Sequence, residues 1–168
     1  MTWFRRSADH ADSGESGRRG LPLDQDPDES PAGLRATLFS LNRFVNQNSG
    51  RLPGEAVVAA RRVTDTLREV IDTSEVRPLD VYAVVSVKGA LQDYLPTTLR
   101  TYLAVDPSLV DTPRSSGRSP RQSLLEQLDD LQRSASLVLE AAQNQDVDAL
   151  MTQGAFLRTK FSASDLDL

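Results

Sequence analysis

The sequence predicts an all-α fold: an antiparallel helical bundle of about five helices with a kink at Pro96, preceded by a disordered N-terminal tail. Apolar residues recur at steps of three and four along most of residues 31–161, which is the spacing of one helix face. Serine–proline pairs, typical of helix starts, stand at positions 30–31 and 119–120. The chain of 168 residues is long enough for one domain with its own core.

Residues 1–30 are predicted to be a disordered acidic tail. After Phe4 their only large apolar residues are Leu21 and Leu23, too few to offset the entropy lost on ordering. The exception is the head of the chain, an aromatic pair followed by two arginines. It is interpreted either as an inert start or as a docking motif for a partner or an anionic membrane, formed by Trp3, Phe4, Arg5 and Arg6.

The helical bundle domain is predicted over residues 31–161, and its first two helices are amphipathic. Ser30 caps the first helix, which ends near Gly50. Its apolar face comprises Leu34, Leu38, Leu41 and Val45, widened by Phe39 and Phe44. The second helix runs from about Glu55 to Ser74. Its stripe comprises Ala56, Ala60, Val63, Leu67 and Val70.

A third helical segment runs from about Leu79 to Ala104. Its valine-rich first half has strand propensity, but the helical spacing continues for more than 20 residues. Lys88 borders the stripe, where a snorkelling lysine is favoured over a catalytic amine. Gly89 is expected to let another helix approach closely. The apolar stripe comprises Val81, Val84, Val87, Leu91, Leu95, Leu99 and Tyr102.

Pro96 interrupts this third segment. Because proline has no N–H, the carbonyl of Gln92 loses its helical donor. Either one helix kinks there, or a second helix begins with Asp93 as its cap. A structural kink is favoured over a small interaction site, for example for an anion. The residues of that site would be Tyr94, Pro96, Thr97, Thr98, Arg100 and Tyr102.

A loop over residues 106–119 leads to the two last helices. The fourth helix, over about 121–143, has a coiled-coil-like heptad seam formed by Leu124, Leu128, Leu131, Ala135, Val138 and Ala142. Asp146 caps the fifth helix. Its face comprises Val147, Leu150, Gly154, Leu157 and Phe161, with Met151 and Phe156 beside it. Residues 162–168 form a short acidic tail.

The sequence shows no catalytic or metal-binding set. It has no cysteine, and its one histidine is His10 in the tail, so we expect no Ser-His-Asp arrangement, no metal and no cofactor. The net charge of −5 divides into −3 on residues 1–30, −2 on residues 162–168 and zero between them. A neutral core argues against nucleic acid as a partner. No apolar run is long enough for a transmembrane segment, and we expect a cytoplasmic protein.

Three runs of the sequence are distinctive: YLPTTLRTYL from Tyr94 to Leu103, LLEQL at 124–128 and FLRTKF at 156–161. Through these runs, about residues 82–161 resemble the XpaC-type family. That family is named for an indolyl-phosphate hydrolysis phenotype and is associated with toxic-anion resistance. The resemblance implies a helical, cytoplasmic, stress-associated protein and supplies no catalytic residues.

These observations predict a non-enzymatic helical interaction protein. It would act as an adaptor or regulator of a protein partner in a cytoplasmic stress or toxic-anion response. Homo-oligomerisation stays open. The alternative is the phosphate-ester hydrolase that the family's name suggests.

Overall fold

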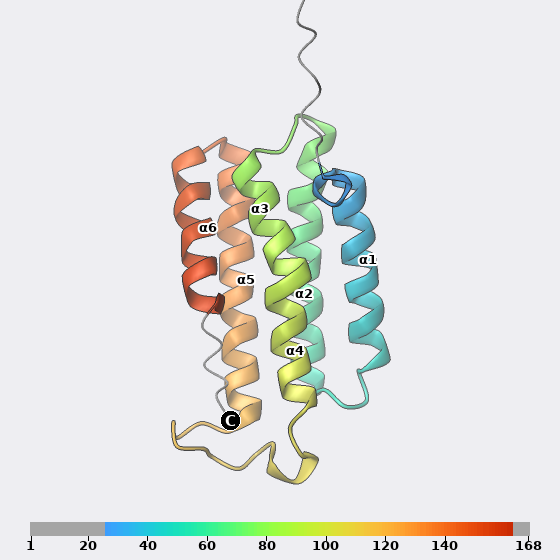
Figure 1. Cartoon of the computed structure of the whole chain (residues 1–168), viewed down its shortest axis with the longest axis vertical. Helices are drawn as coiled ribbons and strands as arrows, with labels where there is room; N and C mark the ends of the chain where they lie inside the picture. Colours follow the sequence, from blue (N-terminus) through green and yellow to red (C-terminus); the bar gives the residue numbers. More distant parts are fainter. Residues whose placement is uncertain (1–25, 163–168) are drawn as a thin grey trace, which may run out of the picture.

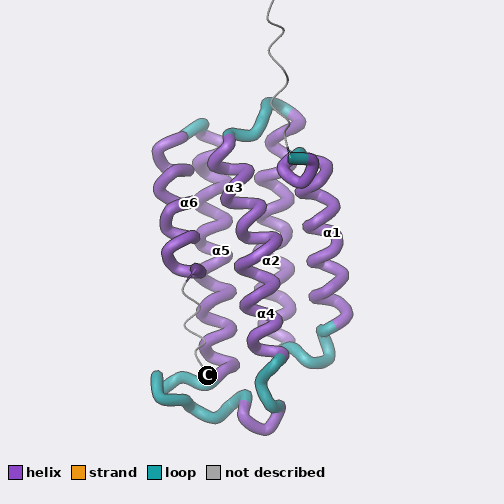
Figure 2. The backbone as a smooth tube through the Cα atoms, in the orientation of Figure 1, coloured by secondary structure: helices purple, strands orange, loops and turns teal. Residues whose placement is uncertain are grey.

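The computed structural model describes residues 26–162, and the regular structure of this part is helical throughout, as expected (Figures 1 and 2). It contains six α-helices: α1 (Pro31–Gln47), α2 (Gly54–Asp72), α3 (Val81–Gly89), α4 (Leu95–Leu103), α5 (Pro120–Asn144) and α6 (Val147–Ser162). Three single turns of 3₁₀-helix accompany them: η1 (Pro27–Glu29), η2 (Thr73–Glu75) and η4 (Pro107–Leu109). The predicted all-α bundle is confirmed.

Consecutive helices run antiparallel along the long axis of the molecule (Figure 1). The exception is the third segment, in which α3, a π turn (η3, Ala90–Tyr94) and α4 follow one another without a break. We call this continuous helix the central rod. It packs against α1, α2, α5 and α6. The bundle therefore has five long helical elements, in agreement with the sequence.

The helix starts follow from local side-chain chemistry. Ser30 Oγ accepts from the Gly33 N–H at 3.0 Å, with Pro31 as the first helical residue. Ser119 and Gln122 form a reciprocal capping box at the start of α5. These caps satisfy N–H groups that have no partner within the helix, and they explain why both serine–proline pairs begin helices.

The core confirms the stripes predicted for α1, α2 and α5, with few exceptions. All four predicted face positions of α1 and all five of α2 are buried, as are the first five seam positions of α5. Ala142 is only half-buried, and Ala141 is buried in its place. Phe39 was expected to widen the face of α1, but 66% of it is exposed, whereas Phe44 packs against the core.

A π turn accommodates Pro96. This geometry is neither of the two alternatives predicted from the sequence, which were a kinked helix and a helix break. The Leu95 N–H donates to the carbonyl of Ala90, five residues back, rather than four residues back as in an α-helix. Asp93 lies inside the π turn and does not cap a new helix. Pro96 then begins the first turn of α4, where a missing N–H costs little.

The π turn contains one residue more than an α-helical turn, so the positions that face the core shift by about one residue along the rod. After it, Leu95, Leu99 and Tyr102 are buried as predicted. Before it, the inward face is formed by Ala83, Ser86 and Val87. Val81 is therefore 61% exposed and Val84 only half-buried. The uninterrupted spacing assumed from the sequence was wrong for these two residues.

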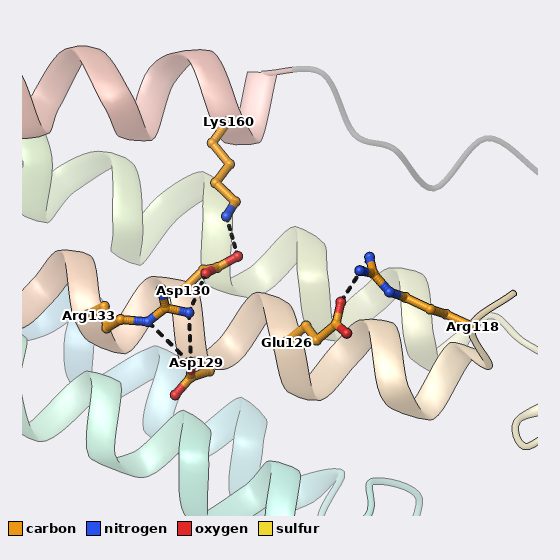
Figure 3. Close-up of polar contacts among 6 residues, drawn as sticks. All are labelled: Arg118, Glu126, Asp129, Asp130, Arg133 and Lys160. Carbon is orange, nitrogen blue, oxygen red and sulfur yellow. Dashed lines mark hydrogen bonds and ion pairs between the residues drawn. The ribbon is translucent and has the colours of Figure 1, made fainter. Parts of the chain in front are cut away.

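Helix α6 packs on α5 and α3. Leu150 and Leu157 are buried as predicted, whereas Val147 is 43% exposed. On the α5 side, Asp130 accepts from Arg133 at 2.7 Å and also pairs with Lys160 of α6 (Figure 3). This carboxylate joins the two helices near the end of α6.

The last five residues of the segment predicted to be disordered, 26–30, are ordered, and residues 1–25 and 163–168 lie outside the described part. Lys88 Nζ pairs with Asp26 at 2.9 Å and with Glu29 at 3.0 Å. A β-carbon on Gly33 would collide with the Pro27 carbonyl oxygen, so η1 packs directly on the backbone of α1.

Candidate functional site

The residues proposed from the sequence as an interaction site lie around the rod rather than on one surface. Pro96, Thr98 and Tyr102 are buried, whereas Thr97 and Arg100 are exposed. No common polar surface brings the six together. The remaining member, Tyr94, is half-buried.

Tyr94 and Arg100 contact different neighbours. The Tyr94 ring stacks on Phe161 of α6, with 5.3 Å between the ring centroids. The Arg100 guanidinium lies 5.5 Å from the ring centroid of Phe44 on α1, a cation–π contact. The two side chains therefore do not converge on a shared ligand position.

The proposed docking motif of Trp3, Phe4, Arg5 and Arg6 lies outside the described residues.

A cavity of about 280 Å³ lies between α3, the π turn and α6. We call it the α3–α6 cavity. Ser86 and Gly89 line it from α3, Asp93 and Tyr94 from the π turn, and Gly154, Leu157 and Arg158 from α6. Only Tyr94 of these belongs to the site proposed from the sequence.

Two glycines shape this cavity. A β-carbon on Gly154 would lie 3.3 Å from Ser86 Oγ, so this glycine allows α6 to approach α3 closely. A β-carbon on Gly89 would lie 3.0 Å from the Tyr94 ring. The space at Gly89 is thus taken by a side chain from the π turn of the same rod, and not by another helix as the sequence suggested.

Ser86, one of the residues that line the cavity, has a fully buried hydroxyl that faces Gly154 of α6. The residue is 2% exposed, and its Oγ has no hydrogen-bond partner among residues 26–162. A buried hydroxyl without a partner costs about 1–3 kcal/mol. Packing alone does not explain a serine here, because alanine could occupy this helix position without the free-energy cost of burying a hydroxyl. Sequence reasoning missed Ser86, since an isolated serine in a helix carries no local signal.

Two charged groups stand at the cavity without an ion-pair partner in the described part of the chain: Asp93 and Arg158. Both act on Tyr94. Burial raises the pKa of the Tyr94 hydroxyl, the Asp93 carboxylate raises it further, and Arg158 opposes the shift. Asp93 and Arg158 therefore have opposite electrostatic effects on the Tyr94 hydroxyl.

Lys88 also lines the cavity, but its amine is already engaged by two carboxylates. Hydrogen bonds to Asp26 and Glu29 raise the pKa of Lys88 above its ordinary value. An amine that stays protonated at neutral pH is a poor nucleophile. The contacts of Lys88 thus match a structural lysine rather than a catalytic amine.

Helices α3 and α6 also carry exposed apolar side chains. On α3 these are Val81, Tyr82 and Val85, and on α6 they are Val147 and Met151. The two helices pack against each other and run in the same direction (Figure 1). We call these five side chains the α3–α6 face.

Residues 26–162 contain no group of three or more histidine, cysteine, aspartate or glutamate residues that could hold a metal ion. None of the helices in this range is both long and apolar enough to cross a bilayer.

Comparison of the chain with protein-family models, with curated proteins and with solved structures finds no match in any of the three.

Proposed function

We propose that the protein is a non-enzymatic helical interaction protein, an adaptor or regulator, which binds an amphipathic helix of a protein partner along the α3–α6 face. The observation that carries this proposal is the exposure of five large apolar side chains on two adjacent helices. Exposed apolar surface that gathers in one place, unlike scattered single residues, marks interaction sites.

The spacing of the face supports a helix as the bound element. Val81 and Val85 stand four residues apart on α3, and Val147 and Met151 stand four residues apart on α6. Each pair therefore lies on one side of its helix, one turn apart. Adjacent helices with such pairs offer apolar contacts at the spacing that the apolar stripe of a third helix would need.

A cytoplasmic stress or toxic-anion response is the setting that we propose, and it rests on the resemblance to the XpaC-type family alone. The phosphate-ester hydrolase suggested by that family's name has no further support. Tyr94 and Arg100, two polar members of the interaction site proposed from the sequence, do not meet, because they contact Phe161 of α6 and Phe44 of α1 respectively.

The test is affinity capture from the native cell with matched variants, in each of which one exposed apolar residue is replaced by aspartate. Val81→Asp and Met151→Asp place a charge on the α3–α6 face, and Val58→Asp places one on α2, where Val58 is 57% exposed. We expect one partner to be recovered with the parent and with Val58→Asp and to be lost with the other two. Circular dichroism controls for folding.

Retention of all captured proteins by Val81→Asp and Met151→Asp would contradict the proposal. Self-association is a separate outcome. If the face bound a second copy of the chain, sedimentation would show a parent dimer and a monomeric Met151→Asp variant, and the partner would be the chain itself.

A further inference from the structure

We infer that a short acidic segment of a protein partner binds on the outer surface of α1, beside α2, through two arginines and one exposed phenylalanine. We call this surface the α1 patch, and it comprises Phe39, Arg43, Asn46 and Arg61. The inference goes beyond the proposed function and does not depend on it, because α1 and α6 lie at opposite edges of the bundle (Figure 1).

Direct contacts hold the four side chains of the patch together. The Arg43 guanidinium carbon lies 5.7 Å from the centroid of the Phe39 ring, one turn back along α1. Arg61 of α2 donates a hydrogen bond to Asn46 Oδ1. Phe39, Arg43 and Asn46 also line one open hollow of about 390 Å³. The patch is therefore a single surface to which two helices contribute.

The two arginines of the patch have no carboxylate partner among residues 26–162. Nearer the start of α1, by contrast, Arg35 pairs with Asp72 at 2.9 Å and with Glu75 at 3.0 Å. Arg43 contacts an aromatic ring and Arg61 a neutral amide. The described part of the fold thus leaves two positive charges of the patch without a neutralising group.

The sequence around the patch adds almost no negative charge. Residues 31–64 contain five arginines and one acidic residue, Glu55, and Glu55 lies 3.5 Å from Arg121 of α5. This segment therefore has a net charge of +4, and residues 65–161 have −4 because the two together sum to zero. The bundle concentrates its positive charge on α1 and the first half of α2.

Carboxylates are the groups that this patch suits. A guanidinium binds a carboxylate through two parallel N–H donors. Arg61 has donors only, so the Asn46 oxygen must face it, which leaves the Asn46 NH₂ as a further donor for a ligand. Phe39 is 66% exposed and offers an apolar contact beside these donors. The ligand is therefore an acidic segment that also contains an apolar residue.

A nucleic acid fits the same surface less well. Proteins that bind it without sequence preference use many phosphate contacts and several aromatic rings for successive bases. The patch has two arginines and one ring, and Arg43 already lies over that ring. The net charge of −4 on residues 65–161 would repel a longer polyanion. A short acidic peptide meets neither obstacle.

The test is a titration of the purified full chain with a capped peptide that has two aspartates on each side of one leucine. Two matched peptides replace either all the aspartates by asparagine or the leucine by glycine. We expect the acidic peptide to shift the amides of Phe39, Arg43 and Arg61, and to leave those of Val81 and Met151 unchanged. Both matched peptides should bind more weakly, the asparagine peptide by at least about tenfold. Added salt should weaken the binding of the acidic peptide.

Variants with matched net charge identify the arginines responsible. The double variant Arg43→Gln/Arg61→Gln should bind the acidic peptide at least about tenfold more weakly than the parent chain. The double variant Arg62→Gln/Arg158→Gln loses the same charge from exposed positions of α2 and α6 outside the patch, and it should bind as the parent does. Thermal melts confirm that both variants fold.

Three results would overturn the inference. One is the absence of binding by the acidic peptide. Another is an equal loss of binding in the two double variants, because net charge alone would then attract the peptide. The third is tighter binding of a single-stranded oligothymidylate with the same number of charges, which would make the patch a nucleic-acid surface.

Discussion

Ser86 and Gly154 hold α3 and α6 at a separation that leaves little spare room. A β-carbon on Gly154 would lie 3.3 Å from Ser86 Oγ, closer than an ordinary van der Waals contact. At the same time, the Ser86 hydroxyl is buried without a partner in the described residues. The Ser86 hydroxyl therefore destabilises the fold, and it also leaves room only for a glycine at position 154.

A double-mutant cycle tests this coupling. Ser86→Ala should raise the free energy of unfolding by about 1–3 kcal/mol, because it removes a buried unsatisfied hydroxyl. Gly154→Ala should gain the helix propensity of alanine, up to about 1 kcal/mol, only when Ser86 is already alanine. Urea denaturation measures all four proteins. Additivity to within about 0.5 kcal/mol would show that the two residues do not crowd each other.

Lys88 fixes the segment before α1 through charge. Its amine lies 2.9 Å from Asp26 and 3.0 Å from Glu29. The hydrogen bond from Lys88 lowers the pKa of Asp26, and the carboxylates raise the pKa of Lys88. Each group is thus held in its charged form by the folded state.

The attachment of η1 should therefore depend on pH at both extremes. The contribution of Asp26 is complete above its unfolded pKa of about 3.9 and is lost as the pH falls through its lower folded value. The contribution of Lys88 is complete below its unfolded pKa of about 10.4 and is lost as the pH rises through its higher folded value. The Glu29 amide donates to the Asp26 carbonyl at 2.8 Å. Its protection factor against hydrogen exchange should be constant from about pH 5 to pH 10 and should fall outside that range. If a Lys88→Gln variant had the same protection at every pH, the ion pairs of Lys88 would not be the cause of this pH dependence.

At the scale of the element, the central rod depends on the π turn for its packing. Leu91 within the turn and Leu95 and Leu99 after it are each no more than 1% exposed. An α-helix advances by about 100° per residue. Removing the extra residue of the π turn would therefore rotate the buried residues of α4 away from the core.

Pro96→Ala tests whether packing or proline maintains the π turn. Alanine supplies the missing N–H, and its gain in local propensity is at most about 3 kcal/mol. A straightened rod would expose Leu95 and Leu99, at about 1.5–3 kcal/mol each, and Tyr102 as well. We expect the variant to keep the π turn and to melt no higher than the parent. If Pro96→Ala melted clearly above the parent, core packing would not be what maintains the π turn.

The sequence was informative where a helix is regular and misleading where it is not. On α5, the heptad spacing located every buried leucine of the seam because no residue interrupts the α-helical phase. On α3, the same reasoning placed Val81 in the core, because a π turn has no spacing signal that distinguishes it from an α turn. Pro96 marked the place of the irregularity but left its geometry open.

The candidate cavity could be predicted only in part, for a similar reason. Tyr94 was singled out because it stands beside Pro96 in a distinctive run. Ser86 and Arg158 stand 72 positions apart in the sequence, and their places in one cavity lining follow from how α6 packs on α3. No local pattern in the chain carries that information.

At the scale of the whole molecule, α5 connects most of the bundle. It packs against α2, α3, α4 and α6. Leu124, Leu128 and Leu131 of its seam are nearly fully buried. Loss of packing on α5 should therefore destabilise each of the helices that contact it. We expect the bundle to unfold as one cooperative unit.

Two leucines of α5 provide a matched comparison. Leu131 is 1% exposed and Leu137 is 52% exposed. Leu131→Ala should lower the free energy of unfolding by about 2–5 kcal/mol through the cavity that it leaves. Leu137→Ala should change it by no more than about 0.5 kcal/mol. Chemical denaturation followed by both circular dichroism and tyrosine fluorescence should give one coincident transition for each protein, and separate transitions would refute the single unit.

The packing of the bundle, the position of Tyr94 over Gly89 and the α3–α6 cavity all depend on one structural claim, the π turn before Pro96. The most direct measurement is the scalar coupling across the backbone hydrogen bond of Leu95 in a labelled sample. A correlation between the Leu95 amide nitrogen and the Ala90 carbonyl carbon is expected, because the Leu95 N–H donates five residues back. A correlation to the Leu91 carbonyl carbon instead would show an α-helical turn and contradict the account.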